Sequence, residues 1–160
     1  MKADHSNMSG MMEDHYRKLW IMAVLSFISM YILMYAMVNS ISNVFNNVNE
    51  FYMAGLMTAP MIPIEIFLMR SMYKDPRRNA LMLAISVLLG LAFFFLIRQQ
   101  GAVSDKQFLR SMIPHHAGAI LMCEQASIQD AEIQELCKTI ISSQQEEIDK
   151  MKAKLQELDQ

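Results

Sequence analysis

The stretch ALMLAISVLLGLAFFFLI, Ala80–Ile97, decides the fold because it holds no charged residue. A helix rises about 1.5 Å per residue, so roughly 20 apolar residues cross a bilayer core about 30 Å thick. Two further runs have this length: Leu19–Val38 carries no charge, and Phe51–Met69 carries only Glu65. Three such runs leave too little polar sequence to cover them in a soluble core. We therefore predict an all-α chain with three membrane spans, near 19–38, 51–69 and 80–97.

The orientation follows from the positive charges in the loops between these runs. The loop after the second run holds Arg70, Lys74, Arg77 and Arg78, whereas the loop Asn39–Glu50 holds no Lys or Arg. Cytoplasmic loops retain the positive charge in membrane proteins. We expect a bacterial inner (plasma) membrane protein with a cytoplasmic N-terminus. Its C-terminal segment is expected in the periplasm or outside the cell.

The remaining sequence divides into a tail and a polar C-terminal segment. Residues 1–17 form a polar tail that we expect to be unfolded on its own, ahead of a membrane domain over 18–98. Residues 104–160 show helical rather than strand periodicity. Ser104 and Gln107 fit a capping box for a helix that extends to about Ala126, and Pro114 predicts a kink or break near residues 111–113.

A second helix is predicted after a turn near residues 127–130. Asp130 is its candidate N-cap, and apolar residues recur from Ile133 onward at three- and four-residue spacing. A lone hairpin of two helices buries little apolar surface. We therefore expect a homo-oligomer in which hairpins complete a four-helix bundle.

Candidate metal ligands concentrate in MIPHHAGAILMCE, Met112–Glu124. At 100° per residue, one third of this helix's circumference gathers Phe108, Met112, His115, His116, Ala119, Met122 and Cys123. The facing helix could add Met151, Cys137 and Gln144, the last as a hydrogen-bond partner for a ligating histidine. Thioether and thiol groups select soft ions, above all Cu(I), and imidazole suits copper and zinc. Packing is the competing interpretation, because Met on a helix stripe usually fills a core.

The same stretch resembles a known family. The pattern Asp105…Phe108…Met112-Ile-Pro-His-His-Ala-Gly-Ala-Ile…Met122, followed by Ile140-Ile141…Gln144…Glu147-Ile148…Met151, is similar to the domain of unknown function 305 (DUF305). The resemblance covers about Ser104–Leu155. It implies a ferritin-like helical module of the bacterial envelope that is associated with copper handling. The positions that match the family's Met/His pattern are Met112, His115, His116, Met122 and Met151.

Three other groups of residues extend or compete with the copper hypothesis. Cys123 and Cys137 lie on facing helices, so a disulfide is one alternative, but their offset along the axis favours free or metal-facing thiols. The tail carries further candidate ligands, namely His5, Met8, Met11, Met12 and His15. The second span carries a stripe of Met53, Met57, Met61 and Glu65. This stripe is either packing or a Cu(I) path, and Pro60 and Pro63 should kink the span there.

Other function classes find little support. The chain has no Glu-x-x-His motif of the kind that di-iron bundles use, no phosphate-binding loop and no zinc-finger spacing. The acidic C-terminal segment argues against nucleic-acid binding. We expect a non-enzymatic, membrane-anchored copper protein, with Cu(I) favoured over Cu(II), that buffers copper, confers tolerance or passes metal to other copper-handling proteins. An oligomerisation module without metal and a transporter remain alternatives.

Overall fold

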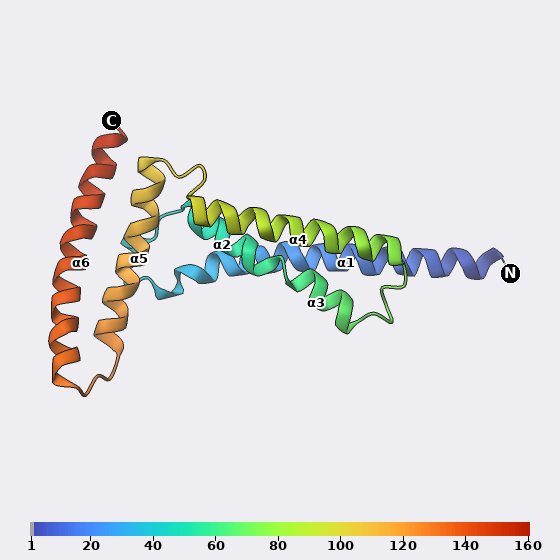
Figure 1. Cartoon of the computed structure of the whole chain (residues 1–160), viewed down its shortest axis with the longest axis horizontal. Helices are drawn as coiled ribbons and strands as arrows, with labels where there is room; N and C mark the ends of the chain where they lie inside the picture. Colours follow the sequence, from blue (N-terminus) through green and yellow to red (C-terminus); the bar gives the residue numbers. More distant parts are fainter. Residues whose placement is uncertain (1) are drawn as a thin grey trace. The chain divides into compact units, whose positions relative to one another are not determined.

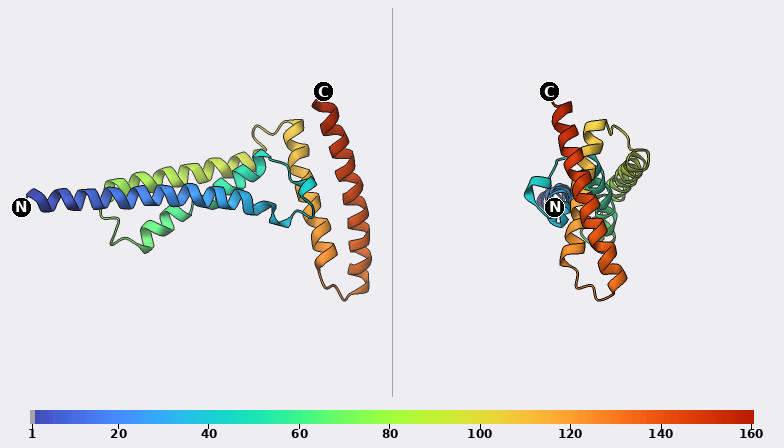
Figure 2. Two further views of the ribbon diagram at one scale, coloured as in Figure 1. Left: turned by 180° about the vertical axis from the view of Figure 1, so that it is seen from behind. Right: turned by 90° about the vertical axis from the view of Figure 1, so that its left-hand side faces the viewer.

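The computed structural model describes residues 2–160, with side chains described from residue 13 onward, and this part of the chain is helical with no β strand (Figures 1 and 2). The all-α prediction is therefore confirmed. The helices are α1 Lys2–Leu33, α2 Val48–Thr58, α3 Met61–Leu68, α4 Pro76–Gln99, α5 Asp105–Gln125 and α6 Ala131–Leu158, with short 3-10 turns η1 Met34–Met37 and η2 Ile41–Asn43.

Three helical stretches are long and apolar enough to cross a membrane. They are Glu13–Met37, Val48–Leu68 and Pro76–Gln99, and they contain the three runs that the sequence singled out, apart from one residue at the end of the first and of the second. Asp75 begins α4 with a side chain that accepts hydrogen bonds from the backbone N–H groups of Arg77 and Arg78. Pro76 at the first helical position suits this start, because its missing N–H would have no partner there.

The N-terminal tail is helical, which corrects the expectation of an unfolded segment. Helix α1 begins at Lys2 and continues without a break into the first apolar run. No proline interrupts it, and the Tyr16 hydroxyl donates a 2.7 Å hydrogen bond to the side-chain oxygen of Asn79. The Tyr16 ring also packs on Tyr73, with centroids 5.3 Å apart. Together these contacts fix the polar end of α1 against the start of α4.

The second apolar run is divided into two helices at the prolines for which a kink was predicted. Helix α2 ends at Thr58 and α3 starts at Met61. Pro63 has no N–H, so the carbonyl oxygen of Ala59 loses its partner within the helix. The buried Ser86 hydroxyl of α4 donates a hydrogen bond to that oxygen. A neighbouring helix thus satisfies the backbone group that the proline exposes.

The chain forms two compact units that are not contiguous in sequence. One comprises residues 1–32 and 51–101, and the other comprises residues 33–50 and 102–160. The loop between the first two apolar helices therefore belongs with the C-terminal hairpin, whereas the sequence placed it in the membrane domain. Val38 and Phe45 from this loop pack on the hairpin's core, and Ser111 donates a hydrogen bond of 3.2 Å to the Asn47 side-chain oxygen.

The hairpin itself has the predicted helices and caps. The Ser104 hydroxyl accepts the N–H of Gln107, and the Asp130 carboxylate accepts the N–H groups of Glu132 and Ile133. The capping box is only half formed, because the Gln107 side chain instead accepts the N–H of Val48. Helix α5 passes through Pro114 without ending, so the alternative of a broken helix is wrong. The core of the hairpin contains Ile113, Ala117, Ile120, Ile148 and Leu155.

Candidate metal-binding face

Two side-chain ion pairs and one disulfide fix the register of α5 against the antiparallel α6. Lys106 pairs with Asp159 at 2.8 Å near the open end, and the Lys106 ammonium holds the pKa of that carboxyl below its ordinary value. His116 pairs with Glu147 at the middle, and Cys123 joins Cys137 near the turn. The register that sets residue 116 opposite 147 also sets Met112 opposite Met151, one helical turn closer to the open end.

His116 is a structural residue in this arrangement. Its ring is buried, with Nδ1 2.9 Å from the carbonyl oxygen of Met112 and Nε2 2.6 Å from the Glu147 carboxylate. A carbonyl oxygen only accepts, so Nδ1 must carry a proton and leaves Nε2 as the one nitrogen that could bind metal. That nitrogen is occupied by Glu147, which must move before His116 can act as a ligand.

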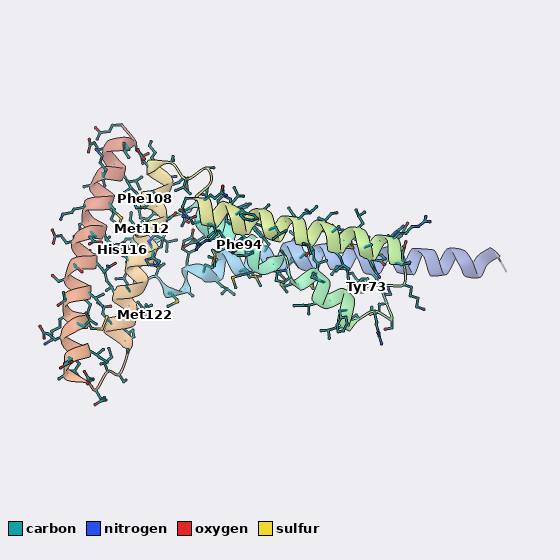
Figure 3. The ribbon with its side chains drawn as sticks, viewed as in Figure 1. Tyr73, Phe94, Phe108, Met112, His116 and Met122 are labelled. Atoms are coloured by element: carbon teal, nitrogen blue, oxygen red, sulfur yellow. A yellow bond between two sulfur atoms is a disulfide. The ribbon has the colours of Figure 1, made fainter. Side chains whose placement is uncertain are left out.

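His115 has a different environment although it is the next residue. Its side chain is exposed, its ring centroid lies 6.1 Å from that of His116, and it makes no hydrogen bond to the described part of the chain. Phe108 and Met122 are also exposed, to 51% and 54%. The expected convergence on a buried stripe is therefore only half right. His116 is buried, whereas Phe108, His115 and Met122 are exposed. Figure 3 labels Phe108, Met112, His116 and Met122 along α5.

The five family-pattern positions divide between two levels of the hairpin. Met112 and Met151 are both half-buried and lie at the same level, and His115 follows Met112 by one turn. Met122 lies ten residues after Met112 on the same unbroken helix, a rise of about 15 Å. Two methionine side chains cannot span that distance to one ion. Met112, His115 and Met151 therefore lie within about one helical turn of one another along the hairpin, and Met122 cannot join Met112 at one ion.

Cys123 and Cys137 form a disulfide, which corrects the preference for free or metal-facing thiols. Their Cα atoms are 5.3 Å apart, within the range that a disulfide requires. The offset expected from the sequence is absent because the residues between Gln125 and Ala131 form an extended connection rather than a tight turn. A bonded pair offers no thiolate to a metal, so these residues close the turn end of the hairpin instead.

Glu147 is the residue at this face that the sequence analysis missed. We expected Gln144 to bond a histidine, but the partner of His116 is Glu147, whose side chain is 52% exposed. The sequence holds no local signal for this pair, because the residue opposite His116 depends on the register between the two helices. Among residues 13–160, no three His, Cys, Asp or Glu side chains come together. The donors on the face are therefore mainly thioether and imidazole groups.

The remaining candidate ligands lie elsewhere. The side chains of His5, Met8, Met11 and Met12 fall outside the described residues. The buried Nδ1 of His15 has no hydrogen-bond partner among the side chains that the structure describes. The second-span stripe is not carried by one continuous helix. The break after Thr58 separates Met53 and Met57, which are 38% and 46% exposed on α2, from Met61 and Glu65 on α3.

These features define a class: an all-helical protein with three apolar stretches long enough to cross a membrane and a disulfide-closed helical hairpin. The chain belongs to the same family as uncharacterized protein L153 of Acanthamoeba polyphaga mimivirus. The two are 35% identical over 140 residues, covering 86% of this chain and 90% of that protein. Residues 95–155 match the Domain of unknown function (DUF305), so the resemblance seen in the sequence is confirmed at the level of the family. No solved structure shows significant similarity.

Proposed function

We propose that this protein is a membrane-anchored, non-enzymatic copper-binding protein that takes up Cu(I) as cargo on the hairpin face. The observation that carries the proposal is the common level of Met112 and Met151, with His115 exposed one turn away. Two thioethers and an imidazole are soft and borderline donors, a set that favours Cu(I) over harder ions. Buffering, tolerance or transfer to another copper-handling protein would all use such a site.

The topology is part of the same proposal. The basic loop over residues 70–78 favours a cytoplasmic N-terminus, which places the hairpin on the far side of the bilayer. The Cys123–Cys137 disulfide supports this side, because disulfides persist in oxidising compartments such as the bacterial periplasm. The hairpin would then meet copper outside the cytoplasm.

The test is Cu(I) affinity of the full chain in detergent, measured anaerobically against a Cu(I) chelator without added thiol, so that the disulfide stays intact. Replacing His115 and His116 together with Ala should abolish most binding. His115→Ala alone should weaken binding at least tenfold with little change in thermal stability, because this side chain makes no hydrogen bond in the hairpin. Unchanged stoichiometry and affinity in both variants would refute the site.

A structural role is the second candidate, and the environment of His116 favours it. Both ring nitrogens of His116 are used within the hairpin, as expected of a residue that holds α5 against α6. In that case His116→Ala loosens the hairpin whether or not metal is present, and no variant of Met112 or Met151 changes copper binding. Melting curves recorded with and without Cu(I) separate the two functions.

A further inference from the structure

One face of α5 is covered neither by α6 nor by loop 33–50. Helix α6 packs on one side of α5, and loop 33–50 packs on another, where the Met37 carbonyl oxygen lies 3.4 Å from the Cβ position of Gly118. Between them, side chains recur at alternating spacings of four and three residues. We call this set the α5 seam: Phe108, Met112, His115, Ala119 and Met122. The α5 seam contains no Asp, Glu, Lys or Arg. Its spacing is that of a coiled-coil contact.

Helix α6 extends the same open face. The Glu147 side chain reaches His116, which shows which side of α6 borders the seam, and helical spacing places Leu136 and Ile140 on that side as well. Ile133 and Leu136 are 48% and 56% exposed. Two helices of about 20 residues, packed side by side, present a face of roughly 30 Å by 20 Å. That footprint approaches the roughly 800 Å² per partner of a standard protein interface.

We propose that a second copy of this chain covers the seam, packed antiparallel about a two-fold axis that passes by His115. The spacing of the seam is what points to this partner, since its members fall at minus seven, minus three, zero, plus four and plus seven relative to His115. This pattern of spacings is nearly unchanged when the direction along the helix is reversed. A two-fold contact presents the same patch on both copies, so this self-complementarity is what it requires.

The side chains that meet in this arrangement fit one another. Phe108 of one copy comes level with Met122 of the other, an aromatic–thioether contact that is favourable in protein interfaces. Met112 comes level with Ala119, so a long side chain faces a short one, as interdigitating helices need. The two His115 residues then face each other at the axis.

This pairing completes the copper site and rests on the proposed function. Within one chain, the exposed His115 is joined by Met112 and Met151 as proposed ligands. With the second copy in place, two imidazoles converge on the axis and one Cu(I) is shared between two chains. The expected stoichiometry is therefore one copper per two chains.

The experiment uses the full chain in nanodiscs, with mass and copper content measured together. Ala119→Glu places a charge in the centre of the seam without removing a ligand, and Ser142→Glu places the same charge on an exposed position on the other side of α6. The unaltered protein and Ser142→Glu should be dimers with one copper per two chains. Ala119→Glu should be monomeric, with copper affinity lowered at least tenfold.

A cross-linking measurement checks the axis without metal. With the native cysteines held in their disulfide, His115→Cys should be joined between chains by a short bis-maleimide, whereas Ser142→Cys should not. A monomeric unaltered protein, or cross-linking at residue 142 alone, overturns the proposed dimer. One copper per chain that persists in Ala119→Glu overturns the shared site but leaves the copper function standing. A dimer that cross-links at residue 115 but binds no copper supports the seam and overturns the copper function.

Discussion

At the scale of single residues, the adjacent histidines show how one position on a helix decides a side chain's role. His115 and His116 differ by 100° around α5, which is enough to leave one exposed and bury the other against α6. The buried ring has acceptors at both nitrogens, so it stabilises the hairpin. The exposed ring of His115 makes no hydrogen bond to the described part of the chain. The His-His pair therefore contains one residue that stabilises the hairpin and one whose ring is exposed.

Glu147→Ala should destabilise the hairpin by about 1–2 kcal/mol, because it leaves the buried His116 ring without its carboxylate partner. Glu146→Ala is the matched control, since Glu146 pairs only with the exposed Lys150 one turn along α6. We expect Glu147→Ala to lower hydrogen-exchange protection in the middle of α5, and Glu146→Ala to leave it unchanged. Equal effects of the two variants would mean that the His116 pair has no special role.

At the scale of elements, the break between α2 and α3 shows how a neighbouring helix compensates for a proline. Pro60 and Pro63 remove two backbone donors from an apolar segment that is long enough to cross a membrane. The hydroxyl of Ser86, in the middle of α4, replaces one of these donors by donating a hydrogen bond to the Ala59 carbonyl oxygen. Ser86 is otherwise an odd residue in a run of Leu, Ile and Phe, and this contact accounts for it.

Ser86→Ala should therefore cost roughly 0.5–2 kcal/mol in the unaltered chain, the range found for polar contacts between membrane helices. In a Pro63→Ala background the same change should cost little, because the alanine N–H can bond the Ala59 carbonyl oxygen within the helix. Thermal unfolding in detergent of the two single variants and the double variant measures this coupling. Additive effects would show that Ser86 acts on something other than the freed carbonyl.

At the scale of the whole molecule, the chain separates into an apolar unit and a polar hairpin unit, with loop 33–50 part of the latter. The loop's asparagines bond one another and α5: the Asn49 amide donates to Ser111 at 3.2 Å, and the Asn43 amide donates to Asn39 at 2.8 Å. If the chain spans a membrane three times, loop 33–50 and the hairpin must lie on the same side, because they fold together.

Two exposed serines provide the topology test. Ser42→Cys lies in loop 33–50, and Ser71→Cys lies in the basic loop after α3. In intact cells, a membrane-impermeant maleimide should label the cysteine at 42 and reach the one at 71 only after permeabilisation. The unaltered chain should not react without a reductant, because its two cysteines are bonded. The reversed labelling pattern would place the hairpin in the cytoplasm and contradict the proposed topology.

The sequence alone determined the helical class, the three apolar runs and both helices of the hairpin. These features depend on local properties: uncharged length, helical periodicity, and caps such as Ser104 and Asp130 that act within three residues of their own position. The prolines of the second run predicted a kink for the same reason. Local chemistry also supplied the correct family resemblance around Met112–Met122.

Tertiary structure decided everything that depends on register between distant segments. The extended connection after Gln125 brought Cys123 and Cys137 together, and the resulting alignment chose Glu147 over Gln144 as the partner of His116. The same alignment set Met112 beside Met151 and left Met122 about 15 Å away along the helix. A helical wheel gives the direction of each side chain but not its level against a neighbouring helix. That level is fixed only when the two helices pack.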